Sequence, residues 1–412
     1  MTTPGAHESA AREPAARAPA AGEPSAFGWV SVDAVRQTAA ELLGAGRLPE
    51  PEDAAALVEE LREDAETAID LVLTVMRMDT ETDTRVRRRL AEGRTLIVDR
   101  LSWVEANAQS FGRVLADAAA ATGTADPSRT QRWASSVEMG AALAIVGSRV
   151  LGQFDPFTAD GRLLLVAPNI LTVERELDVP ARDFRLWVAV HERTHHVQFA
   201  AAPWLQAHLQ ERMQAFLAPV IAGSLPGASR QPDGIENPGL VETLAALARA
   251  LRDDTSIIDT LIGPRHAELL DEVTALMSLL EGHADVVMDA VGPGVIPSVR
   301  RIRAAFDIHR HSATGIKAIV NRVLGIDEKL AQYTRGAAFV RAVVRTRGHS
   351  GLNRVWESPD NLPSLYEIEH PADWIARVLD APDQPDQPGQ PDPPDRPDQP
   401  DQPGRLNPPE QA

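Results

Sequence analysis

Apolar residues recur every three to four positions along most of the chain, which is the spacing of an amphipathic α-helix. In residues 52–78, for example, Leu57, Leu61, Ala65 and Ile69 fall on one stripe. The same periodicity predicts further helices at residues 31–43, 100–119, 135–151, 180–201, 237–251, 266–291, 298–324, 327–346 and 371–379. We therefore expect a protein built mainly from helices.

The sequence indicates strands in only two short segments. Residues 95–99 read Thr-Leu-Ile-Val-Asp and are partly β-branched. Residues 163–166 are apolar and fit either a strand or another buried segment. No internal repeat is found. The expected fold class is mostly α, a multi-helix protein with little strand.

Both ends of the chain differ in composition from the part between them. Residues 1–26 are rich in Ala, Pro, Glu and Gly, and residues 381–412 repeat Pro-Asp-Gln units that contain eleven prolines. Such segments have too few apolar residues for a core, so we expect two disordered tails. The folded domain should span residues 27–380, with a helical N-terminal part (27–160) followed by the part that holds the candidate site (161–380).

The composition narrows the possible functions. The 412 residues include 41 basic and 59 acidic ones, a formal net charge of −18. This charge speaks against a nucleic-acid or anionic-membrane binder, whose contacts require basic surface. No run reaches the roughly 18 apolar residues that a membrane span needs, and the N-terminus lacks the pattern of a secretory signal. We therefore expect a cytoplasmic protein.

The chain has no cysteine. This absence excludes thiolate metal sites, iron–sulfur clusters, disulfides and cysteine nucleophiles. Any metal must therefore be held by histidine and carboxylate side chains.

The predicted helix at residues 180–201 contains His191-Glu192-Arg193-Thr194-His195. Residues four apart in a helix lie one above the other, so His191 and His195 can place two imidazole nitrogens on one Zn²⁺. Glu192 lies one step around the helix, beside the metal. There it can take a proton from a zinc-activated water that attacks a carbonyl, and later protonate the leaving amine. The motif predicts a zinc-dependent metallohydrolase with Glu192 as general base.

A catalytic zinc usually has three protein ligands. Glu281 is the favoured third ligand, because Asp285 follows four residues later on the same helix face. Asp285 could accept a hydrogen bond from the outer nitrogen of a ligand histidine and so orient the ring. His283 is the alternative ligand. It lies about 200° around the helix from Glu281, so the two cannot easily face one metal.

At these residues the sequence resembles the actinobacterial zincin-like metallopeptidase family, formerly of unknown function. One branch of that family is associated with coenzyme F420 biosynthesis. The resemblance covers nearly all of residues 27–379. It rests on a set of short segments in a fixed order: Val98-Asp99-Arg100 with Trp103 and Asn107; His191-Glu192-x-x-His195; residues 279–285; Gly325-Ile326-Asp327-x-Lys329 with Gln332-Tyr333 and Gly336; and Trp356, Pro363 and Trp374. It implies a zincin-like metallopeptidase fold and zinc dependence, but no substrate.

Residues 327–333 contain one of the two lysines, Lys329, and one of the two tyrosines, Tyr333, four positions apart on one predicted helix face. Tyr333 is a candidate catalytic residue, because a tyrosine near the metal can stabilise a developing oxyanion. The alternative is that this face packs against the helix that carries the histidines.

We therefore expect a zinc peptidase acting on a peptide or protein substrate. Two alternatives remain at this point. One is a non-catalytic zincin scaffold that serves as a binding or assembly partner in coenzyme F420 biosynthesis. The other is a zinc hydrolase of a non-peptide amide. The sequence does not indicate the oligomeric state.

Overall fold

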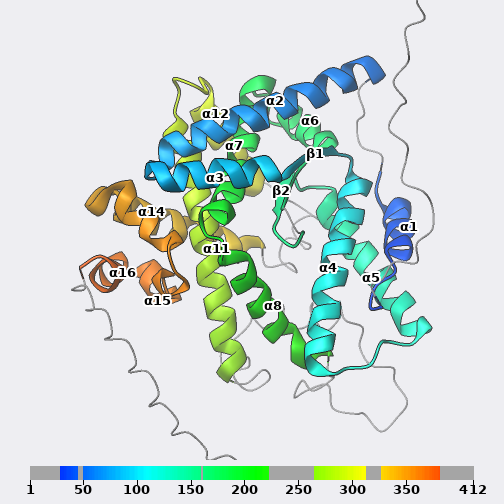
Figure 1. Ribbon diagram of the computed structural model, residues 1–412. Helices are drawn as coiled ribbons and strands as arrows, with labels where there is room; N and C mark the ends of the chain where they lie inside the picture. Colours follow the sequence, from blue (N-terminus) through cyan, green and yellow to red (C-terminus); the bar gives the residue numbers. More distant parts are fainter. Residues whose placement is uncertain (1–27, 45–49, 159–160, 222–263, 312–325, 381–412) are drawn as a thin grey trace, which may run out of the picture.

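The structure is a computed structural model that describes residues 28–44, 50–158, 161–221, 264–311 and 326–380. Helices dominate it, and three short strands form one small sheet (Figure 1). The elements, in chain order, are α1 (Val32–Leu42), α2 (Pro51–Met76), α3 (Thr80–Glu92), β1 (Arg94–Val98), α4 (Arg100–Thr122), α5 (Arg129–Gly147), β2 (Gly152–Asp155), β3 (Arg162–Val166), α6 (Ala167–Glu176), α7 (Ala181–Ala201), α8 (Leu205–Ile221), α11 (Pro264–Val291), α12 (Val299–His311), α14 (Ile326–Asn353), two 3₁₀ turns (Arg354–Trp356 and Pro359–Asn361), α15 (Leu365–Glu369) and α16 (Pro371–Val378). The prediction of a mostly α fold with little strand is confirmed.

The sheet has the strand order β1-β3-β2. β1 runs parallel to β3, and β2 runs antiparallel to it, with Gly152 opposite Leu165. The central strand is buried on both faces, because Leu163 and Leu165 enter one hydrophobic core while Leu164 and Val166 enter another. This explains why residues 163–166 show an unbroken apolar run instead of the alternation typical of a half-exposed strand.

The two hydrophobic cores lie on either side of the sheet. The larger core surrounds α7 and includes apolar residues of α2, α3, α11 and α14. The smaller one is formed mainly by α1, α4 and α5, and the end of α8 joins it through Leu217 and Ile221 (Figure 1). The cores therefore do not follow chain order. β2 and β3 pair across the expected boundary at residue 160, and α2 packs against α7 of the later part.

Several elements differ in detail from their predicted bounds. The helix expected at 135–151 starts earlier, at Arg129, because Ser128 and Gln131 form a capping box, and it ends at Gly147. α3, β2, α6 and α8 were not predicted. Charged residues dominate α3, and β2 is only four residues long, so neither gives a clear apolar period. The helix expected at 237–251 and both predicted tails lie outside the described residues.

α11 and α14 cross with their backbones in direct contact at two glycines. A Cβ atom on Gly282 would lie 2.2 Å from the carbonyl carbon of Gly336, and a Cβ on Gly336 would lie 1.8 Å from the carbonyl oxygen of Ser278. Both distances are far shorter than any non-bonded contact allows. The crossing explains why α11 tolerates a glycine, which costs a helix about 1 kcal/mol relative to alanine.

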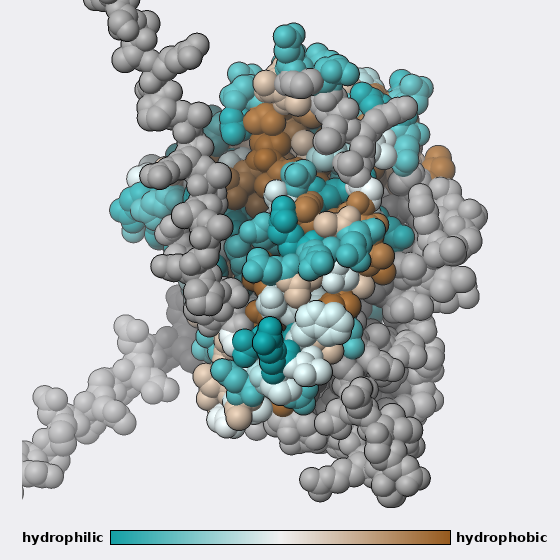
Figure 2. Space-filling view, turned by 90° about the vertical axis from the view of Figure 1, so that its right-hand side faces the viewer, coloured by the Kyte–Doolittle hydropathy of each residue, from teal (hydrophilic) through white to brown (hydrophobic). Residues whose placement is uncertain are grey.

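The face of the molecule in Figure 2 is largely polar, and apolar residues gather in its upper half without covering it. Among the residues that the structure describes, no helix combines the length and apolar character needed to cross a membrane.

We expect Gly336→Ala to lower the free energy of unfolding by about 1–3 kcal/mol, because the neighbouring atoms are backbone and cannot turn away. Chemical denaturation measures the change. Gly294→Ala is the matched control, since a Cβ there meets nothing within 4 Å. If the two variants prove equally stable, α11 and α14 do not cross as closely as described.

Candidate metal centre

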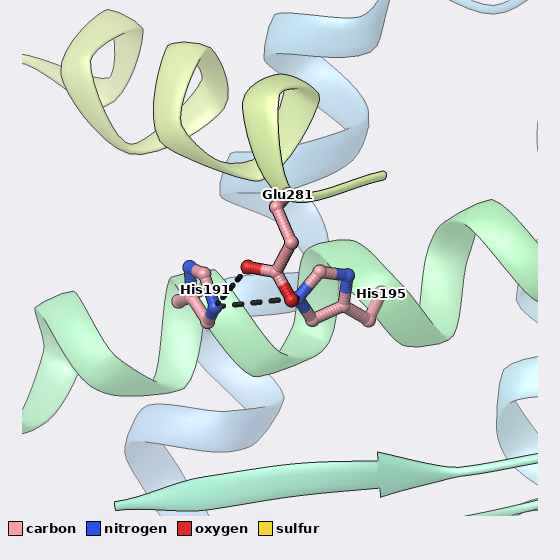
Figure 3. A group of neighbouring side chains, drawn as sticks. All are labelled: His191, His195 and Glu281. Carbon is pink, nitrogen blue, oxygen red and sulfur yellow. Dashed lines mark hydrogen bonds and ion pairs between the residues drawn. The ribbon is translucent and has the colours of Figure 1, made fainter. Parts of the chain in front are cut away.

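Two histidines of α7 and one glutamate of α11 converge at the point where these helices meet. His191 and His195 are one helical turn apart on α7, and Glu281 reaches them from α11 above (Figure 3). Their ligand atoms all lie within 4.8 Å of one another. The structure thus brings together the three residues that the sequence proposed as metal ligands.

The distances fit a small metal ion. The Nε2 atoms of His191 and His195 are 3.2 Å apart, and the rings are perpendicular. The Glu281 carboxylate oxygens lie 3.6 Å from Nε2 of His191 and 3.7 Å from Nε2 of His195. Two ligand atoms of a tetrahedral zinc, each bonded at about 2.0–2.1 Å, are separated by about 3.4 Å. Two nitrogens and a carboxylate at these separations form a donor set that suits Zn²⁺.

His283 does not point into this group. Its side chain is buried, and its Nδ1 accepts a hydrogen bond from Nε2 of Gln198 at 2.9 Å. Its ring lies 5.4 Å from that of Trp356. Burial lowers the pKa of His283 to about 3, so the ring is neutral. The structure groups Glu281, and not His283, with the two histidines.

Asp285 has a different partner from the one expected. Its Oδ1 accepts a hydrogen bond from Nη1 of Arg303 at 2.9 Å. The outer nitrogens of the two histidines contact other side chains: Nδ1 of His195 lies 3.0 Å from Oε1 of Gln198, and Nδ1 of His191 lies 3.1 Å from Sδ of Met288. The predicted hydrogen bond between Asp285 and a ligand histidine is therefore not formed here, because Arg303 of α12 holds the carboxylate.

Glu192 is buried against β2. A Cβ atom on Gly152 would lie 2.5 Å from Cγ of Glu192, so the glutamate occupies the space that a side chain at position 152 would need. Burial raises the pKa of the Glu192 carboxyl well above its usual range, and the negative charge of Glu281 raises this pKa further. A hydrogen bond from the backbone N–H of Phe154 lowers it in part. The carboxyl group thus lies near Glu281 and has the desolvated setting of an effective general base.

Arg193, inside the same motif, attaches α7 to its neighbours. Its Nε donates to the carbonyl oxygen of Ala65 at 2.9 Å. Its Nη2 donates to Oε1 of Glu66 at 3.1 Å and to Oγ1 of Thr95 at 3.0 Å. These bonds connect α7 with α2 and β1, and they fix the helix along its axis next to the two histidines.

The sequence did not identify two features of this site. Gln198 follows His195 by three residues, a spacing that places both side chains on one side of a helix. The spacing could therefore have indicated a contact with His195. It could not have indicated the contacts that Gln198 makes with α11. Gly152 gave no usable signal, since a glycine at the start of a short strand has many explanations. Tyr333, the candidate for stabilising an oxyanion, falls within α14, but its side chain lies outside the described residues.

One solved structure resembles the chain over most of its length. It is a crystal structure from Chloroflexus aurantiacus, described as a "putative hydrolase with a novel fold". The two chains share 28% sequence identity with a TM-score of 0.57, and the match covers 84% of this chain and 98% of the other. None of the curated proteins matches the chain.

The profile of the zincin-like metallopeptidase family matches residues 30–375, which is most of the sequence. The match includes α7 and α11 and therefore all three members of the metal-binding group. With this match and the convergence of His191, His195 and Glu281, the chain belongs to the zincin-like metallopeptidase family.

Proposed function

We propose that this protein is a zinc-dependent hydrolase that cleaves peptide bonds. The observation that carries the proposal is the convergence of His191, His195 and Glu281, with the buried carboxyl of Glu192 beside them. Three protein ligands with room for a fourth are typical of catalytic zinc sites, whereas structural sites are closed by four.

His191, His195 and Glu281 would hold the zinc, which would supply the Lewis acidity that polarises a carbonyl group and activates water near neutral pH. Glu192 then has two tasks. It takes the proton of the attacking water, and it delivers this proton to the leaving nitrogen. Its raised pKa supports the assignment, because a desolvated carboxylate holds a proton more readily than one in water.

The edge of β2 supports a peptide substrate. Leu151 pairs with Val166 through a backbone hydrogen bond, and antiparallel pairs alternate, so the backbone groups of Gly152 and Phe154 point away from β3. The N–H of Phe154 bonds to Glu192, so this edge offers a partner strand the backbone groups of Gly152 and the carbonyl of Phe154. Among the described residues no strand pairs with this edge. An extended peptide can add to such an edge through its main chain, and here it would lie next to Glu192.

Two alternatives predict other outcomes. A non-catalytic scaffold, such as an assembly partner in coenzyme F420 biosynthesis, would bind metal without needing Glu192. A hydrolase of a non-peptide amide would need Glu192 but would not cleave peptides. The resemblance to an F420-associated branch is the reason to name that pathway.

We expect the purified protein to hold about one zinc per chain and His191→Ala/His195→Ala to hold almost none, because the double variant lacks two of three ligands. Metal analysis by mass spectrometry measures both. His370→Ala is the control, since this exposed histidine lies on Tyr366, away from the three ligands. Near-zero zinc in wild type and variant alike would contradict the zinc site.

We expect Glu192→Gln to retain zinc and to lower peptide cleavage by about 100- to 10,000-fold, the usual contribution of a general base. The substitution keeps the shape of the side chain and removes its basicity. A peptide library analysed by mass spectrometry reports cleavage by wild type and variant. Identical cleavage by both proteins, or none by either, would favour the scaffold.

We expect Gly152→Ala to lower kcat by about 100-fold, the effect of misplacing a catalytic group by roughly 1 Å, while the zinc content stays unchanged. The added methyl group needs the space of the Glu192 side chain. Gln153→Ala is the matched control, because the next side chain on the strand turns to the opposite face and donates to Asn107. Full activity in Gly152→Ala would show that β2 does not position Glu192.

A further inference from the structure

Gln198 connects the two helices that carry the metal-binding group. It lies on α7 one turn after His195, and its side chain is fully buried. Oε1 lies 3.0 Å from Nδ1 of His195. Nε2 lies 2.9 Å from the carbonyl oxygen of Leu280 and 2.9 Å from Nδ1 of His283. All three polar positions of the amide are therefore used at one point between α7 and α11.

The carbonyl of Leu280 determines which ring nitrogen of His195 carries the hydrogen. A backbone carbonyl only accepts, so the amide must turn its NH₂ group toward Leu280. Oε1 then faces His195 and accepts, which requires the hydrogen of that ring to be on Nδ1. Nε2 of His195 is left with a free lone pair, and this is the atom that faces His191 and Glu281. One backbone group on α11 thus selects the metal-binding tautomer of a histidine on α7.

The same amide aligns α11. Leu280 directly precedes Glu281, and His283 follows it by two residues, so Gln198 is bonded on both sides of the carboxylate ligand. The two hydrogens of the amide have separate acceptors, because Nδ1 of His283 accepts the second one. Rotation or translation of α11 would break one of these two bonds as it moved Glu281. His191 has a weaker outer contact, the thioether of Met288.

We propose that Gln198 is a positioning residue that fixes the tautomer of His195 and the approach of Glu281, and so prepares the site for zinc before the metal binds. This inference rests on the proposed zinc site. Removing a side chain that hydrogen-bonds to a metal ligand typically weakens metal binding by about 10- to 100-fold. No other described side chain contacts the outer nitrogen of His195.

The first experiment uses the metal-free full-length protein. Long-range ¹⁵N–¹H NMR of the imidazole rings distinguishes the two neutral tautomers directly. In wild type we expect the hydrogen of His195 on Nδ1 and that of His283 on Nε2. In Gln198→Leu, which keeps most of the volume and loses every polar contact, we expect His195 to populate both tautomers.

The second experiment measures zinc affinity by competition with a chromophoric chelator. We expect Gln198→Leu to raise the dissociation constant by about 10- to 100-fold. Substituted Co²⁺ should also give a changed visible spectrum, because its bands report ligand geometry, which a purely structural residue would not alter. Gln210→Leu is the matched control, since this half-buried glutamine of α8 donates to Asp117 away from the site.

Gln198→Glu separates positioning from packing. A glutamate can still accept from Nδ1 of His195, so we expect it to keep that tautomer and to bind zinc more tightly than Gln198→Leu does. Equal weakening in both variants with an unchanged tautomer would overturn the assignment, as would wild-type affinity in Gln198→Leu. If Gln198→Leu fails to fold, a mixture of tautomers in Gln198→Glu would overturn it as well. Absence of zinc from the wild type would contradict the proposed function, and the tautomers of the metal-free protein would still decide the role of Gln198.

Discussion

The contact between α7 and α11 is the constraint on which the site depends. Zinc ligands from two helices converge only if the helices keep one separation and one rotation, because a few tenths of an ångström decide whether a bond to the metal forms. Three neighbouring contacts hold this geometry. Gln198 bonds to the backbone of α11, Gly282 brings α11 onto α14, and Arg193 attaches α7 to α2 and β1.

Polar groups in the interior around this contact are costly unless each has a partner. Arg193 has its partners on α2 and β1, and Gln198 has one on α11. Because these hydrogen bonds join different elements, they also specify how those elements pack. Glu192 is the exception. Burial raises the pKa of its carboxyl, and only the N–H of Phe154 offsets this. This setting is unfavourable for an isolated carboxylate and is the one expected of the proposed general base.

The small sheet matters to the site more than its size suggests. Asp155 at the end of β2 is paired with Arg162 of β3 at 2.9 Å and accepts a hydrogen bond from Ser110 of α4. These buried bonds fix β2, and β2 in turn limits the space for Glu192 at Gly152. Side chains of β3 pack into both hydrophobic cores. The edge strand β2, which pairs with β3, is therefore held in place by the packing of both cores. A short strand can therefore position the side chain of Glu192.

The sequence by itself determined the helical class and the pair His191 and His195, because both follow from spacing along one helix. It also favoured Glu281 over His283, since direction around a helix is fixed by residue number. Only the tertiary structure decided which side chains orient the ligands. Asp285 has the right spacing, but Arg303 from α12 takes its carboxylate, and Gln198 reaches the ring of His195 instead. Partners that come from different elements depend on how those elements pack, and no local pattern in the sequence records that.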